Sequence, residues 1–428
     1  MDATSQRHAR QALGLGHGTL VTVGAMVGSG VFFTPAEIAR RTHSTAGALA
    51  VWAVGGLLTA LGALSMAELG AALPASGGLS VWLGRAFGPA VGFAFGWTML
   101  VVLGPSSVAF FASLSAANLS AAFGLSPRIG APLVVLAMAA INLAGVTQTA
   151  WVQSLTTVAR VLGLVVLAAL ALRLGPSVDT VSNHATAPTG LGLLSAVVPV
   201  LWAYDGWIDI TSVGAEVRDP GRVVPRALLL GTGLVTALYL GFAWSLHRAL
   251  GTAALAASQA PGALLGAAVA GPPGARLVSL LVALSTLGAC LIGMLTSTRV
   301  VASLGTQLPR WSRLSGLSSR GTPDLAIVLT AALSLAYLAS AGLGRLAELF
   351  VVGAWPFYAL GALATWRLRK TEAALARPFR VPAAPWVLGG FGVATLAMVG
   401  AFAWQSPGPT LVSLGLVGLA WPLYRWAR

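Results

Sequence analysis

Long apolar runs dominate the sequence, and short segments between them carry nearly all of its charges. Only 8% of the 428 residues are charged and 57% are hydrophobic, whereas soluble domains carry about 25% charged residues. So few charges cannot cover a water-exposed surface, and long runs lack the alternation of a membrane β-barrel. We therefore predict an all-α integral membrane protein embedded in the lipid bilayer. This excludes a soluble enzyme, a disordered chain and a disulfide scaffold, since Cys290 is the single cysteine.

Twelve of these runs are long enough for membrane spans, each of which needs ~20 apolar residues. The predicted spans cover residues 15–41, 46–73, 90–118, 130–148, 153–174, 191–217, 226–248, 274–305, 324–341, 346–369, 386–404 and 409–426. Twelve crossings place both termini on one side, together with most of the 25 basic residues. The positive-inside rule assigns that side to the cytoplasm. The same bias explains the net charge of +14 without a nucleic-acid partner.

Two of the predicted spans are interrupted by helix-breaking residues. The first contains Gly28-Ser29-Gly30 and the sixth contains Tyr204-Asp205-Gly206. Breaks five helices apart predict two inverted repeats, over residues 15–174 and 191–370. A cytoplasmic N-terminal tail (1–14) precedes them, and helices 11 and 12 with a short cytoplasmic C-terminus (386–428) follow. Paired broken helices indicate a transporter binding site, here in a multi-pass protein of the plasma (inner) membrane.

The two breaks expose complementary backbone groups. N–H groups freed around Gly28, Ser29 and Gly30 suit a carboxylate, and carbonyls ahead of the second break accept bonds from an ammonium group. Together they suit the zwitterion of an amino acid, with Trp202 as an aromatic gate. Two simpler interpretations remain open: close helix packing through the glycines, and an interfacial aromatic belt for Trp202 and Trp207.

Five charged residues in or near the spans are further candidates. Asp205 and Asp209 are intramembrane acids, which indicate function, although Asp205 equally suits a cap on a second half-helix. Arg160 is a lone cation in the fifth span and either replaces a coupling cation or forms a structural tie. Glu68 and Glu216 lie near cytoplasmic helix ends. They form either an ion-pair gate with Arg218, Arg222 and Arg299 or ordinary surface salt bridges.

Several segments resemble the amino acid–polyamine–organocation superfamily, and within it the L-type amino acid transporters and their bacterial relatives. The similar segments are Val23 to Phe32, Leu64 to Gly70 with Ser76-Gly77-Gly78, Pro105-Ser106-Ser107, Trp202 to Trp207, Glu216 to Pro220 with Pro225-Arg226-Ala227, and Arg377 to Pro382. The resemblance covers nearly the whole chain. It implies a five-plus-five inverted repeat and sodium-independent amino acid transport, often by exchange.

The resemblance also implies roles for individual residues. Gly28, Ser29 and Gly30 would hold the substrate carboxylate, and carbonyls of Trp202, Ala203 and Asp205 its ammonium group. Trp202 matches the family's aromatic gate, and Trp355 falls where family members have an aromatic residue in the side-chain pocket.

Three departures from the family pattern stand out. Arg160 replaces a lysine whose ammonium substitutes for sodium, and arginine cannot lose its proton at working pH. The segment Ala302 to Thr306 lacks the family's acidic residue. The loop between helices 3 and 4 lacks the cysteine that joins animal members to a glycoprotein, so we expect no covalent heavy-chain partner.

These observations predict a secondary transporter for amino acids, with neutral substrates favoured by a mainly apolar pocket. It would work by alternating access without sodium, as a uniporter or exchanger. Proton-coupled transport of cationic amino acids or polyamines is the alternative, because Asp205 and Asp209 can select a cation. An integral membrane enzyme is a weaker alternative, since the sequence shows no cluster of catalytic groups. We predict no metal and no cofactor.

Overall fold

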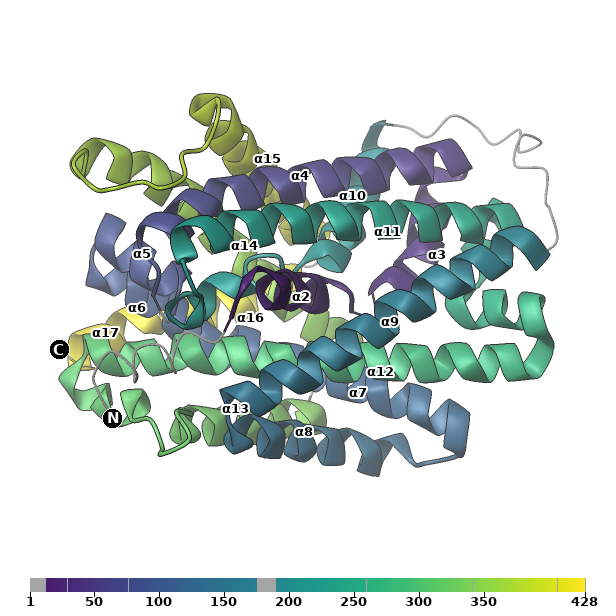
Figure 1. Ribbon diagram of the computed structural model, residues 1–428, viewed down its shortest axis with the longest axis horizontal. Helices are drawn as coiled ribbons and strands as arrows, with labels where there is room; N and C mark the ends of the chain where they lie inside the picture. The colour runs from purple at the N-terminus through teal and green to yellow at the C-terminus, as the bar shows by residue number, and fades with distance from the viewer. Residues whose placement is uncertain are drawn as a thin grey trace.

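The structure is a computed structural model, and it describes residues 13–28, 30–75, 77–174, 190–258, 260–340, 342–405 and 407–427. Within these ranges the regular structure is helical, except for one isolated parallel β-bridge between Leu13 and Val217. Most of the long helices run along the long axis of the molecule (Figure 1).

Eight of the described helices are long and apolar enough to cross a membrane. They are α4 (Thr45–Ala72), the continuous α6 (Pro89–Thr98), η1 (Met99–Leu103) and α7 (Gly104–Phe123), then α8 (Pro127–Ala144), α9 (Val146–Leu174), α11 (Pro220–Ala257), α12 (Pro261–Gln307), α14 (Leu343–Thr371) and α15 (Ala384–Gln405). The prediction of a helical protein with several membrane-length helices is confirmed.

The other four predicted spans contain shorter helices. These are α2 (Leu15–Met26) with α3 (Gly30–Thr42), α10 (Gly190–Tyr204), α13 (Asp324–Ser340), and α16 (Pro407–Gly418) with α17 (Ala420–Ala427). A further helix, α5 (Leu79–Phe87), lies in what the apolar pattern predicts as a loop.

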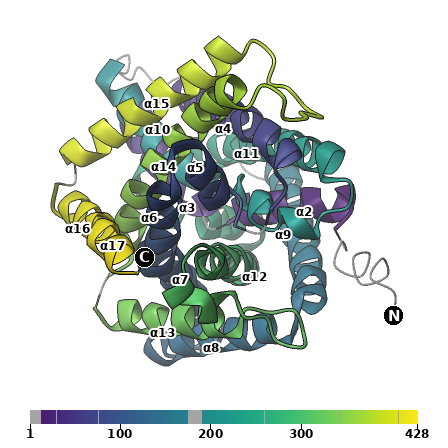
Figure 2. The same ribbon diagram turned by 90° about the vertical axis from the view of Figure 1, so that its left-hand side faces the viewer.

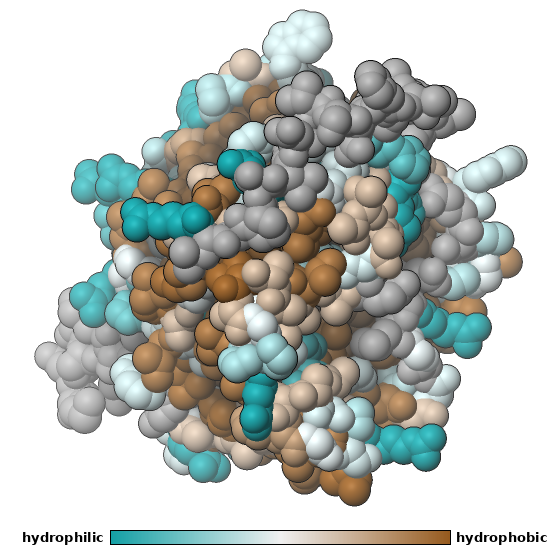
Figure 3. Space-filling view, turned by 90° about the vertical axis from the view of Figure 1, so that its right-hand side faces the viewer, coloured by the Kyte–Doolittle hydropathy of each residue, from teal (hydrophilic) through white to brown (hydrophobic). Residues whose placement is uncertain are grey.

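The bundle has two ends, which we name after buried residues. At the Glu68 end α4 and α14 finish, and α5, α6 and α17 lie there as well (Figure 2). At the His247 end α4 begins and α11 finishes, and the His247 ring nitrogen Nδ1 lies 3.1 Å from Thr252 Oγ1. Figure 3 faces this second end, where apolar surface reaches between scattered hydrophilic residues.

Large apolar side chains cover much of the outer surface of the bundle. Trp386 and Trp404 of α15 are 83% and 89% exposed, and Leu411 of α16 is 71% exposed. A water-soluble monomer rarely exposes a continuous surface of this kind. The sides of the bundle are therefore suited to contact with lipid chains.

Both predicted helix breaks are present. The first crossing stops at Met26 and resumes at Gly30, and α10 stops at Tyr204. After α10 the chain turns at Gly206, whose φ of 96° favours glycine. It then continues as two 3-10 turns, η2 (Asp209–Ser212) and η3 (Gly214–Glu216). The interpretation of Asp205 as the cap of a second half-helix is therefore wrong, because no α-helix follows it before α11.

Candidate functional site

A pocket lies where the two broken crossings meet in the interior of the bundle. The first break contributes Met26, Gly28 and Gly30 to its lining. The second break contributes Trp202, Ala203, Asp205 and Gly206. Further lining residues come from α5, from the segment after Gly206, from the α6–α7 crossing, and from α12 and α14. They include Leu79, Ile208, Asp209, Thr211, Ser212, Phe95, Met99, Leu103, Ser107, Phe111, Ala289, Ile292, Gly293, Thr296, Ser297, Phe350 and Tyr358. Most of these side chains are apolar.

At the first break, the beginning of α3 faces the pocket. Because α3 starts at Gly30, the amides of its first turn have no acceptor within the helix, and they carry partial positive charge. A Cβ on Gly28 would lie 3.3 Å from Phe111 Cε1, whereas one on Gly30 would lie 2.8 Å from Ala203 Cα. Gly28 therefore borders the pocket, and Gly30 also lets α3 pack closely on α10. Ser29 lies outside the described residues.

At the second break, the last carbonyls of α10 already accept hydrogen bonds. The Asp205 N–H donates to Trp202 O (3.2 Å), and the Tyr239 hydroxyl, which donates its one proton either to Met26 O or to Ala203 O, lies 3.0 Å from Ala203 O. A carbonyl oxygen has two lone pairs, so each can still accept a bond from a ligand. The carbonyl end of α10 thus lies beside the N–H end of α3, and both line the pocket.

Trp202 packs among aromatic rings inside the bundle. Its ring contacts Phe110 and Phe350 edge-to-face, with centroids 5.3 and 5.2 Å away. Trp207 is buried between Tyr358 and Phe391. The alternative of an interfacial aromatic belt is therefore wrong for both tryptophans.

The structure differs from the expectation at Trp355. Its ring is buried and packs against Tyr358 at 5.5 Å, and Trp355 is not among the described residues that line the pocket. Phe350 and Tyr358 line it instead. At 3.6 residues per turn, Trp355 lies about 140° around α14 from Phe350, which takes its side chain away from the pocket.

Both acids of the second break line the pocket. Asp209 Oδ2 accepts a hydrogen bond from Thr296 Oγ1 (3.2 Å), and Asp205 accepts one from the Tyr358 hydroxyl. The Asp205 Oδ1 atom is buried without a hydrogen-bond partner among the described residues. Within the described ranges, no lysine or arginine forms an ion pair with either acid. The pocket therefore combines an apolar lining with two carboxyl groups.

Arg160 of α9 lies fully buried between α2 and α12. Its guanidinium group donates to Gly24 O (2.6 Å), Ser285 O (2.9 Å) and Thr157 Oγ1 (2.9 Å). Gly24 O belongs to the last turn of α2, where helix carbonyls lack partners and carry partial negative charge. Arg160 thus places a positive charge beside the first break, between the two helices where the sequence predicts it.

Two further side chains satisfy carbonyls at the breaks. The Ser285 hydroxyl donates to Val27 O (2.9 Å) or Gly28 O (3.1 Å). The Tyr239 hydroxyl lies 2.7 Å from Met26 O and 3.0 Å from Ala203 O, so it connects the first break to the second. The sequence analysis missed Tyr239 and Ser285, because each lies in a long apolar helix with no local motif.

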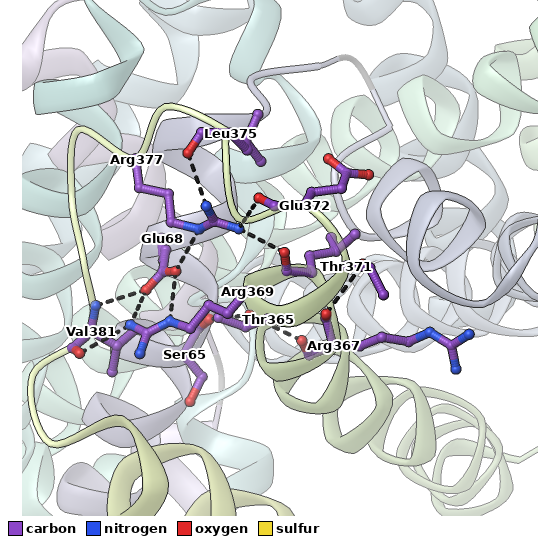
Figure 4. Close-up of polar contacts among 12 residues, drawn as sticks. Ser65, Glu68, Thr365, Arg367, Arg369, Thr371, Glu372, Leu375, Arg377 and Val381 are labelled. Carbon is purple, nitrogen blue, oxygen red and sulfur yellow. Dashed lines mark hydrogen bonds and ion pairs between the residues drawn. The ribbon is translucent and has the colours of Figure 1, made fainter.

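Glu68 of α4 is fully buried at the Glu68 end. It accepts hydrogen bonds from Arg369 of α14 and from the Val381 N–H (2.9 Å), and Arg377 Nε lies 3.2 Å from it (Figure 4). The partners expected for Glu68 among Arg218, Arg222 and Arg299 are therefore wrong. Arg369, Arg377 and Val381 follow Glu68 by some 300 residues, and local spacing cannot reveal such contacts.

Glu216 is the acid that does pair with Arg299, at 3.1 Å, which joins η3 to α12. Arg222 pairs instead with Asp219, at 3.8 Å. Nearby, Arg85 of α5 pairs with Glu372, at 2.7 Å. The Arg85 guanidinium donates to Glu372 and so lowers the pKa of that carboxyl group below its ordinary value.

A membrane bundle with a pocket at two helix breaks has the architecture of a transporter. The family model described as "Amino acid permease" matches residues 13–416, and the chain belongs to this family. Similar curated proteins are b(0,+)-type amino acid transporter 1 of Rattus norvegicus (32% identical over 87% of this chain and 79% of the relative) and the serine/threonine exchanger SteT of Bacillus subtilis (29%, over 90% and 89%). Solute carrier family 7 member 13 of Mus musculus is also similar (29%, over 89% and 82%).

Membership in this family confirms three predictions from the sequence. The chain is related to the amino acid–polyamine–organocation superfamily, it is an amino acid transporter and it is not an enzyme. The family and the membrane-length helices together make it a multi-pass membrane protein.

Proposed function

We propose that the protein binds an amino acid at the two breaks and carries it across the plasma (inner) membrane by alternating access. In this proposal the chain crosses the membrane twelve times, with inverted repeats over residues 15–174 and 191–370 and both termini in the cytoplasm. The Glu68 end is then the cytoplasmic end, in keeping with the basic bias of the sequence.

One observation carries this proposal. The N–H end of α3 and the carbonyl end of α10 lie side by side and line the same pocket. The first attracts a carboxylate and the second attracts an ammonium group. An amino acid presents both groups on one carbon atom, so its backbone fits the two breaks whatever its side chain. In this proposal the backbone at Gly28 and Gly30 binds the carboxylate. The backbone carbonyls of Trp202, Ala203 and Asp205 bind the ammonium group.

The side chain of the substrate then faces the α6–α7 crossing, α12 and α14. Apolar lining residues such as Phe95, Met99 and Ile292 favour a neutral substrate. The carboxyl groups of Asp205 and Asp209 support a second candidate, a cationic amino acid or polyamine. Asp205 Oδ1 in particular has no partner among the described residues.

We further propose that transport does not need sodium. Arg160 holds a permanent positive charge between α2 and α12, where it satisfies the Gly24 and Ser285 carbonyls. An exchange mechanism is supported by the printed name of the relative SteT, a serine/threonine exchanger. A covalent heavy-chain partner is not part of the proposal, because residues 124–126 between α7 and α8 contain no cysteine.

Uptake into proteoliposomes tests the proposal. Purified protein is reconstituted, and uptake of labelled leucine, serine, arginine and putrescine is measured in sodium and in choline buffer, with and without internal substrate. We expect saturable uptake of at least one amino acid, unchanged when choline replaces sodium. Faster uptake with internal substrate identifies exchange, and preference for arginine or putrescine identifies the cationic alternative. No saturable amino acid uptake under any condition would overturn the proposal.

A further inference from the structure

A cluster of arginine and tryptophan residues lies at the Glu68 end, away from the pocket. It is built by η4 (Pro309–Ser315), which follows α12, and by α17, with α6 beside both (Figure 2). The Phe93 ring of α6 contacts Trp311 of η4 at 5.6 Å and Tyr424 of α17 at 5.7 Å. These buried aromatic contacts fix η4 and α17 relative to each other.

The arginines of the cluster are held in place by neighbouring tryptophans. The Arg310 guanidinium lies over the Trp426 ring, 5.0 Å from its centroid, and donates to Trp426 O. The Arg425 guanidinium lies over the Trp421 ring at 4.9 Å. Arg313 follows Arg310 by three residues, and side chains three apart lie in line on a 3-10 helix. Arg310 and Arg313 therefore share one edge of η4.

The acid that follows η4 in the chain is Asp324, at the start of α13, and its carboxylate accepts a hydrogen bond from the Thr322 hydroxyl. None of the ion pairs formed by the described residues involves Arg310, Arg313 or Arg425, and all three are exposed. The sequence contains no acidic residue in 220–323 or after Glu372. The cluster can therefore attract an external anion.

The neighbouring surface indicates that this anion is part of a lipid. Trp421 and Trp426 are 55% and 63% exposed, and tryptophan concentrates at the membrane–water interface. Directly before α17, α16 exposes Leu411, Val412 and Leu414 along its side, where acyl chains can lie. Arginine binds phosphate with paired N–H groups, and anionic lipids attract basic segments at the membrane surface.

We propose that η4 and α17 form a binding site for the headgroup of an anionic phospholipid, with Arg310, Arg313 and Arg425 around the phosphate. The lipid would join the α12 side of the bundle to its last helix. This proposal does not depend on which amino acid the pocket binds.

Native mass spectrometry of the detergent-purified protein tests the site. Phosphatidylglycerol and phosphatidylcholine with identical acyl chains are titrated against the wild type, the double variant Arg310→Gln/Arg313→Gln and the single variant Arg425→Gln. Each arginine near an anionic surface contributes about 1 kcal/mol, so we expect the double variant to bind phosphatidylglycerol about 30-fold more weakly. Weak phosphatidylcholine binding should stay unchanged in all variants.

Arg276→Gln is the matched control, because Arg276 also lies over an aromatic ring, that of Phe123, away from the η4–α17 cluster. It should leave phosphatidylglycerol binding intact. Inorganic phosphate, tested by thermal shift, separates a lipid site from a free-phosphate site. Equal phosphatidylglycerol binding by wild type and double variant would overturn the proposal. So would an equal loss in Arg276→Gln, or stabilisation by phosphate that matches that by the lipid.

Discussion

Gly24 and Arg160 illustrate how single residues define the first break. A Cβ on Gly24 would lie 2.7 Å from Arg160 Nη2 and 2.4 Å from Thr157 Oγ1. The guanidinium group can therefore reach the end of α2 only because residue 24 has no side chain. Ser285 and Tyr239 satisfy the next carbonyls. An unwound segment inside a membrane is tolerated when protein groups satisfy its backbone in this way.

We expect alanine substitutions at Gly28 and Gly30 to have different effects, because the surroundings of the two glycines differ. In Gly28→Ala the new methyl group meets the pocket ring of Phe111, so we expect KM for the transported amino acid to rise about tenfold, while the free energy of unfolding changes by less than about 1 kcal/mol. In Gly30→Ala the methyl group collides with the backbone of Ala203, so we expect a loss of about 1–3 kcal/mol.

Uptake kinetics and thermal unfolding of the two variants measure these effects. Wild-type protein serves as the reference in the same lipid mixture. The reverse order, with Gly28→Ala unstable and Gly30→Ala stable but weak in binding, would contradict the assignment of Gly28 to the pocket wall.

At the scale of helices, Glu68 connects three elements. It lies at the end of α4 and binds Arg369 of α14 and both Arg377 and Val381 of the segment that follows α14 (Figure 4). Arg377 and Glu68 are almost completely buried. The contact therefore fixes the loop before α15 against the end of α4.

Glu68→Gln should destabilise the protein, because it leaves two arginines without a carboxylate in a buried setting. Breaking a buried ion pair costs about 3–5 kcal/mol, and we expect a loss in this range by thermal or denaturant unfolding. Glu372→Gln is the matched control, since its partner Arg85 is 45% exposed and surface pairs contribute about 0–1 kcal/mol. Equal losses in the two variants would show that the buried Glu68 contact contributes no more to stability than the surface pair Arg85–Glu372.

The sequence predicts the elements better than their contacts. Both breaks follow from glycine and polar residues within apolar runs, and the depth of Arg160 in its helix follows from its apolar neighbours. Tyr239, Ser285 and the partners of Glu68 depend on helices far apart in the sequence, which periodicity cannot relate. The expected position of Trp355 in the pocket differs from the structure for another reason. Its position in the family pattern alone does not determine which side of α14 faces the pocket. The 3-10 turns after Gly206 have no clear local signal either.

At the scale of the whole molecule, the segment before the first break and the segment after the second break join at the Glu68 end. Leu13, just before α2, bonds to both residues that flank Val217: its N–H donates to Glu216 O (3.1 Å), and its carbonyl accepts from the Arg218 N–H (2.9 Å). Glu216 in turn pairs with Arg299 of α12. The start of the first crossing and the end of the sixth are thus connected, and one ion pair attaches them to α12.

A double-mutant cycle measures that ion pair. Arg299→Gln and Glu216→Gln should each lower the free energy of unfolding, and the double variant should lose less than the sum of the two. We expect a coupling energy of about 1–3 kcal/mol, because both side chains are mostly buried. Additive losses would show that Arg299 and Glu216 stabilise the fold independently.

The β-bridge at Leu13 also has a practical consequence for experiments. A tag or fusion partner placed ahead of Leu13 lies close in the sequence to a residue whose two hydrogen bonds connect it to the segment after α10. A change in the position of Leu13 would therefore affect the segments next to both helix breaks. Transport rates measured with an N-terminal fusion therefore need comparison with a C-terminal one.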